Sequence, residues 1–111
     1  SFKGVVLESF QITEGRLGEF IIDNNGRRIS LTALIFGRHH ALFGRAEFIQ
    51  VKQVKPGYLT IYVTTKNQEI DCSKLFDATD VHMEISFKII NSPFKTSAGK
   101  VPLLITDRIQ P

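Results

Sequence analysis

The residues best suited to chemistry are two lysines that flank a short loop of small residues. The segment 95–100 reads Lys-Thr-Ser-Ala-Gly-Lys and precedes an apolar segment at 101–105. Small residues let a loop approach a ligand closely and offer backbone N–H groups, and glycine adopts the positive φ that such loops use. A lysine at the end of the loop is a mobile charge that suits a phosphate or a carboxylate. Lys100 is therefore a candidate anion-binding residue, and a solvated loop lysine is the alternative.

Two glycine–arginine pairs lie in the first third of the chain. Gly15 and Arg16 form the first pair, and the segment 26–30 reads Gly-Arg-Arg-Ile-Ser. Taken alone, the first pair indicates a turn, and the second indicates a hairpin with solvated arginines.

Other residue types with chemical potential form no recognisable site. His39 and His40 are adjacent, so they diverge on a helix and do not predict a metal site. His82 falls on the polar face of a strand and is expected to be solvated. Cys72 is the single cysteine, which excludes an internal disulfide and a cysteine-based zinc site. Neither paired carboxylates nor a Walker-type phosphate loop is present, and we expect no metal bound by this chain.

Composition places the chain among ordinary globular domains. It has 111 residues, 42% hydrophobic and 23% charged, which is enough for one domain with one core. The net charge is +3, but the basic residues are scattered, so a nucleic-acid partner is not predicted. No apolar stretch is long enough to span a membrane, and the first residues lack a signal-peptide pattern. With one cysteine, these features predict a cytoplasmic chain with no membrane partner.

Turn signals separate short strand-like and helical segments. Strand-like runs lie at 19–22, 27–30, 46–54, 58–65, 83–89 and 101–105. Helical stretches are expected from Ser30 or Thr32 to Leu42, and over 70–78 with Asp71 or Ser73 at the start. The segment 23–26 ends in Asn-Gly, the strongest short hairpin signal, because both residues tolerate positive φ. Pro-Gly at 56–57 supplies the turn between the middle strands.

Alternation within the strands predicts which residues share a face. Leu59, Ile61 and Val63 would lie on one face, with Ile49 and Val51 opposite them in the partner strand. The run 83–89 also alternates with a period of two. Helices that interrupt a small sheet with one apolar face predict an α+β two-layer domain: an N-terminal β-hairpin plus a split βαβ, ferredoxin-like sheet with two helices on one face.

The three motifs, in their order and spacing, resemble the C-terminal domain of adenylate-forming enzymes. The nearest branch contains the phenylacetate–coenzyme A ligases and the CapK-like proteins. In that branch the small domain begins with Gly-Arg-x-x-Asp-Phe-Ile, continues with a Gly-Arg-x-Ile/Val-Ser hairpin and ends with Lys/Arg-Thr-x-Ser/Ala-Gly-Lys. Here the segments 15–21, 26–30 and 95–100 occupy those places, so the resemblance covers 15–105.

The resemblance implies a role for each matched residue. Lys100 corresponds to the lysine that reaches into the large domain during adenylation, where it contacts the carboxylate and the α-phosphate region. Thr96 and Gly99 belong to the loop that supports it. Arg16 corresponds to the arginine at the domain junction, and Gly18 falls at the hinge position.

The chain departs from the family pattern at three places. Gly18 stands where many relatives carry an Asp or Lys, so it supplies backbone freedom but no side-chain contacts at the hinge. Ala98 replaces a common Ser, and Pro102 replaces a common basic residue. None of these changes removes Lys100.

The resemblance also implies an arrangement of domains and partners. Residues 1–14 would be a linker from a missing large domain, and residues 15–111 would be a C-terminal lid. The partners would be the large adenylation domain, a carboxylic acid and coenzyme A. ATP, Mg²⁺ and coenzyme A would serve the full-length enzyme, with no cofactor held by this domain alone, and the isolated lid would be inactive.

A different class of function also fits the sequence. Small ferredoxin-like domains often stand alone as ligand-sensing or protein-interaction modules without catalytic activity, and such folds host many functions. In that case Lys100 would be a solvated loop lysine. A reading frame that extends several hundred residues upstream favours the ligase, whereas a native start near Ser1 favours the module.

Overall fold

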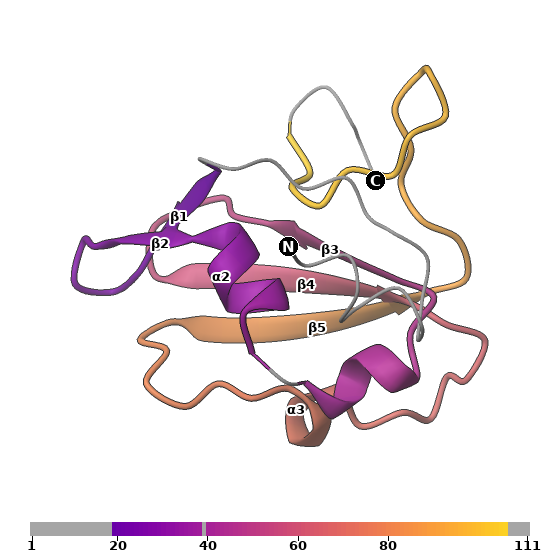
Figure 1. Cartoon of the computed structure of the whole chain (residues 1–111), viewed down its shortest axis with the longest axis horizontal. Coiled ribbons are helices and arrows are strands. Elements are labelled where there is room, and N and C mark those ends of the chain that lie inside the picture. The colour runs from indigo at the N-terminus through magenta and orange to yellow at the C-terminus, as the bar shows by residue number, and fades with distance from the viewer. Residues whose placement is uncertain (1–18, 39, 107–111) are drawn as a thin grey trace.

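A two-stranded sheet and a three-stranded sheet surround one apolar core, with two short α-helices and a 3-10 helix (Figure 1). The computed structural model describes residues 19–38 and 40–106. The expected linker, residues 1–14, lies outside the described residues. The elements are β1 (Phe20–Ile22), β2 (Arg28–Ser30), α2 (Leu31–Phe36), η1 (Ala41–Gly44), β3 (Phe48–Lys52), β4 (Tyr58–Thr64), α3 (Cys72–Leu75) and β5 (Glu84–Ile90). The predicted α+β class is confirmed.

The predicted hairpin forms between β1 and β2, with Ile21 opposite Ile29. Its loop differs from the expected Asn-Gly turn, because Gly26 has a φ of +77° while Asn25 keeps a negative φ. The buried Asp23 organises the loop instead. Its Oδ1 accepts from the N–H groups of Asn25 and Arg27, both at 2.9 Å. A two-residue Asn-Gly turn would need a positive φ at both residues. Here the hydrogen bonds to Asp23 stabilise a loop in which only Gly26 has one.

The first helix is shorter than predicted. Ser30 is its N-cap, with Oγ accepting from the N–H of Ala33 at 3.3 Å. The helix ends at Gly37, well before Leu42, and the chain then forms the separate 3-10 helix η1. A Cβ added at Gly37 would lie 2.5 Å from the carbonyl oxygen of Ala33, so this tight exit requires glycine.

The larger sheet has the strand order β3-β4-β5, with β3 antiparallel and β5 parallel to β4. The predicted inward face is confirmed: Ile49 lies opposite Val63, and Val51 lies opposite Ile61. In contrast to a split βαβ unit, the parallel strands are direct neighbours. The chain crosses from β4 to β5 through α3.

Both α-helices contribute to the core on the same side of the larger sheet. Leu31, Leu34 and Ile35 of α2 and Cys72 of α3 belong to one buried cluster with the inward residues of β3 and β4. Helix α3 is only one turn long rather than spanning 70–78. Asp71 caps it, and the chain becomes extended at Phe76, whose ring enters the core.

The last described segment is not the regular strand expected over 101–105. Within the described residues it pairs with β3 through a parallel bridge between Val51 and Leu104, with two hydrogen bonds of 2.8 Å. Pro102 has no N–H to extend the ladder. Leu103 and Ile105 are nevertheless buried. The segment therefore packs onto β3 as a short strap, which returns the chain to the sheet after the lysine loop.

Candidate functional site: the lysine loop and its base

The lysine loop is a tight, internally hydrogen-bonded turn. The N–H of Gly99 donates to the carbonyl of Thr96 at 2.9 Å, and the N–H of Thr96 donates to the carbonyl of Lys100 at 2.8 Å. The Oγ1 of Thr96 accepts from the N–H of Lys100 at 3.1 Å. Gly99 has a φ of +84°, the conformation predicted for it. The structure thus brings Thr96, Gly99 and Lys100 together in one turn.

These bonds change what the loop can offer a ligand. The N–H groups of Thr96, Gly99 and Lys100 are used within the loop, so they do not form the anion-binding cradle that the composition indicated. Lys95 and Lys100 are exposed, and Figure 1 shows the gold loop projecting away from the sheet. A ligand would therefore meet the charge of the lysine side chains more than the backbone dipoles.

A buried glutamine holds the base of this loop. The Nε2 of Gln50, in β3, donates to the carbonyls of Phe94 and Pro102, both at 2.9 Å. Its Oε1 accepts from the N–H of Phe94 at 3.0 Å. Phe94 precedes the loop and Pro102 follows it, so one side chain joins both ends. Gln50 is fully buried, and this amide makes three hydrogen bonds.

An aromatic contact supports the same base. The ring of Phe94 meets Tyr62 of β4 edge to face, with centroids 5.0 Å apart. Tyr62 and Ile105 are buried together, and Phe94 and Ile90 pack against them. The loop is thus fixed to the second face of the sheet by a small apolar cluster as well as by the amide of Gln50.

Sequence reasoning identified the loop but missed Gln50. The sequence analysis assigned faces to Ile49 and Val51 and gave no role to the glutamine between them. A polar residue flanked by Ile49 and Val51, in a strand that must pair on both sides, was the available signal. The other predicted residues, Arg16 and Gly18, lie outside the described residues.

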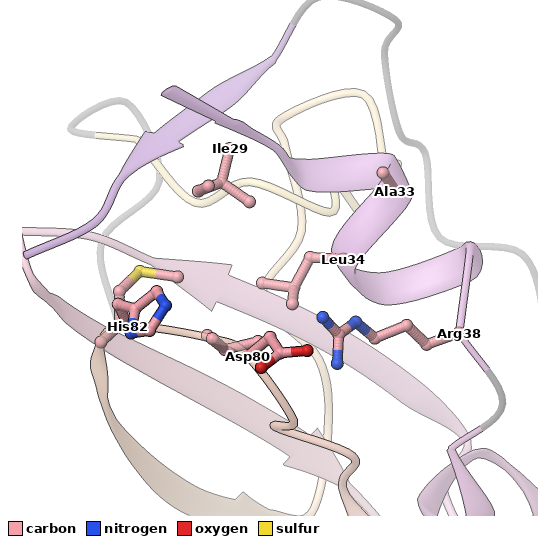
Figure 2. A pocket seen from close by; sticks show the side chains of 8 residues that line it. Ile29, Ala33, Leu34, Arg38, Asp80 and His82 are labelled. Atoms are coloured by element: carbon pink, nitrogen blue, oxygen red, sulfur yellow. The ribbon is translucent and has the colours of Figure 1, made fainter. Parts of the chain in front are cut away.

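A separate small cavity lies between α2 and the segment that leads into β5. It has a volume of about 150 Å³, with an apolar wall of Ile29, Ala33, Leu34, Val81 and Met83. Arg38, Asp80 and His82 complete its lining. Figure 2 shows Arg38 directed from the end of α2 toward Asp80.

Arg38, on the polar side of this cavity, is already engaged in structural contacts. The Nη1 of Arg38 donates to the carbonyl of Thr79 at 2.6 Å and to that of Asp77 at 3.2 Å. The Oδ1 of Asp77 lies 3.7 Å from the same nitrogen. Hydrogen bonds from Thr79 hold the pKa of the Asp77 carboxyl below its usual value, and Arg38 adds to this effect. Arg38 therefore organises the 77–80 turn.

His40, one of the two adjacent histidines, has a structural role. His40 is buried, and its ring stacks on Phe76 with centroids 4.0 Å apart. Its Nδ1 accepts from the N–H of Asp77 at 2.8 Å, so Nε2 carries the proton toward the carbonyl of Leu34 at 2.9 Å. This ring connects the end of α2 to the end of α3. His39 lies outside the described residues.

Residues 19–38 and 40–106 contain no group of three His, Cys, Asp or Glu side chains able to hold a metal ion. In the same ranges, no helix has the length and apolar character needed to cross a membrane.

Comparison with known proteins identifies no relative of this chain. No protein-family model, curated protein or solved structure matches the chain. The features of this chain that bear on its function are therefore the lysine loop, its base and the sequence motifs.

Proposed function

We propose that this chain is the C-terminal lid domain of an adenylate-forming ligase of the phenylacetate–coenzyme A ligase or CapK-like type, and that Lys100 is its adenylation lysine. The observation that carries the proposal is the exposed Lys100 at the end of a turn whose two flanks are joined by the buried Gln50. A charge that stabilises a transition state must be held in place before the reaction. The loop provides that placement for a side chain at the protein surface.

The chemistry would take place in the large domain. A carboxylate oxygen of the substrate attacks the α-phosphorus of ATP, the bond to pyrophosphate breaks, and an acyl-adenylate forms. Negative charge increases on the oxygens around phosphorus, where the ammonium of Lys100 would offset it. In the second half-reaction, a thiol such as that of coenzyme A attacks the acyl carbon and AMP leaves.

Under this proposal, ATP, Mg²⁺ and the carboxylic acid would bind to the large domain. The described residues contribute no carboxylate cluster for Mg²⁺, and their charge at the loop is positive. The lid would supply the cation, orient it and help to exclude water when closed.

The test uses the full-length parent enzyme with Lys100→Ala, and with Lys95→Ala as the matched loop control. Loss of one transition-state contact commonly lowers the rate about a hundredfold, so ATP–pyrophosphate exchange should fall by that factor in the first variant. Lys95→Ala should remain near the wild-type rate. Thioester formation from a supplied acyl-adenylate should be preserved in both variants. Near-normal pyrophosphate exchange in Lys100→Ala would refute the role of this lysine.

A further inference from the structure

Strand β5 forms an open edge of the larger sheet. It pairs with β4 along its whole length, from Glu84 opposite Tyr58 to Ile90 opposite Thr64, and Figure 1 shows it as the outer strand. Among the described residues, no other strand pairs with it. An unpaired edge of seven residues is a template for another strand.

The hydrogen bonds identify which backbone groups of β5 face outward. The N–H of Glu84 donates to the carbonyl of Gly57, and the carbonyl of Ile90 accepts from Thr65. Backbone direction alternates along a strand, so Glu84, Ser86, Lys88 and Ile90 direct their peptide groups toward β4. Ile85, Phe87 and Ile89 direct theirs away from it. No hydrogen bond to these outward groups is found in the described part of the chain.

The side chains of β5 make the strand complementary to itself. Glu84, Ser86 and Lys88 share the exposed face, with opposite charges placed symmetrically about Ser86. In an antiparallel pair centred on Ser86, Glu84 of one copy lies opposite Lys88 of the other, and the reverse pair forms at the same time. Opposite charges across strands are stabilising, and like charges are destabilising.

The backbone favours the same register. With Ser86 opposite Ser86, Ile85 lies opposite Phe87 of the second copy, and both have outward-facing N–H and C=O groups. Each such pair exchanges two hydrogen bonds. A shift that centres the pair on Phe87 would also satisfy the backbone, but it would place Lys88 opposite Ser86 and Glu84 opposite Ile90. Only the register centred on Ser86 combines the backbone bonds with both charge pairs.

We propose that β5 is a self-association edge, at which two copies of this chain pair antiparallel about a two-fold axis through Ser86 to form one continuous six-stranded sheet. The partner is a second copy because the charge pattern matches itself. The two apolar residues that meet across the axis, Ile85 and Phe87, would extend the inward face of the sheet. This proposal is independent of the assignment of Lys100.

The first test is sedimentation equilibrium of the chain from about 5 μM to about 500 μM, a range that resolves a weak dimer. Wild type should show a reversible monomer–dimer equilibrium. Glu84→Lys and Lys88→Glu each place like charges opposite each other, and each should weaken dimerisation at least about tenfold. The double exchange Glu84→Lys with Lys88→Glu should restore it. Both residues are exposed, so the fold should tolerate each change.

The second test fixes the register. Ser86→Cys should form a disulfide-linked dimer, because facing residues of a non-hydrogen-bonded antiparallel pair lie about 4.5 Å apart, within disulfide reach. The native Cys72 is buried, and Ser97→Cys provides an exposed control away from the edge. A strictly monomeric wild type, failure of the double exchange to restore dimerisation, or equally fast cross-linking through position 97 would each overturn the proposal.

Discussion

Replacing Gln50 by leucine tests whether this side chain fixes the base of the lysine loop. Leucine keeps approximately the same volume but removes both amide groups. Three backbone groups then lose their partner: the N–H and carbonyl of Phe94, and the carbonyl of Pro102. Gln50 is fully buried, so water does not replace it unless the loop opens.

The size of the effect follows from these three bonds. At a net contribution of about 1 kcal/mol each, their loss lowers the free energy of unfolding by about 3 kcal/mol. If the loop stayed closed with all three groups unsatisfied, the cost would be larger, because each buried group costs about 1–3 kcal/mol. Opening is therefore the less costly response. We expect a loss of about 3 kcal/mol together with increased exposure of the loop amides.

The assays are urea denaturation and amide hydrogen exchange, with Gln53→Leu as the matched control. Gln53 also makes three hydrogen bonds, but to the N–H and carbonyl of Ile22 and the carbonyl of Tyr58, so it holds the hairpin. Both variants should be destabilised. Only Gln50→Leu should accelerate exchange at Gly99 and in the rest of the loop under native conditions. Unchanged loop exchange, or a stability loss below about 1 kcal/mol, would refute the reasoning.

Four smaller predictions follow from single features. Gly99→Ala should lower the free energy of unfolding by about 1 kcal/mol through its positive φ alone, since a Cβ there has no neighbour within 4 Å; an unchanged urea midpoint would show that the turn relaxes. His40→Ala removes two buried hydrogen bonds and a ring stack, so urea denaturation should show a loss of about 2–4 kcal/mol, and a loss below 1 kcal/mol would contradict this role. Cys72 is buried, which raises the pKa of its thiol, so iodoacetamide should label it only as fast as the chain unfolds; rapid labelling of the native protein would contradict the packing. The lowered pKa of Asp77 gives stability that is present above its usual value of 3.8 and is lost as the pH falls through the folded-state pKa, so Asp77→Asn should flatten the acid limb of a stability–pH curve; a limb as steep as that of wild type would exclude this carboxyl as a cause.

Local patterns predicted much of the fold. Alternation identified the inward face of β4, because a half-buried strand repeats every two residues. Ser30 was one of the two predicted caps of the first helix, with Thr32, and the structure shows Ser30 in that role, since its side chain accepts from the first turn. The helix ends were less predictable. Helix α3 ends at Phe76, whose buried ring contacts His40 and Phe87, and such contacts depend on residues that are distant in the sequence.

The candidate site was also predictable only in part. The positive φ of Gly99 followed from its residue type. The hydrogen bonds of Gln50, in contrast, reach Phe94 and Pro102, which lie 44 and 52 positions later in the chain. Contacts between residues so far apart in the sequence depend on which strand the later part of the chain packs against. Since Pro102 and Leu103 bring the chain back over β3, the polar side chain of Gln50 becomes buried and must find hydrogen-bond partners there.

The hydrogen bonds of Gln50 also have a mechanical consequence. The loop has a closed turn at its tip and a fixed base in β3, so the peptide between them has little freedom to bend independently of the sheet. Any rotation of the whole domain would then carry the backbone of Lys100 through an arc set by its distance from the rotation axis. The loop would act as a rigid lever that sets where the lysine side chain meets its target.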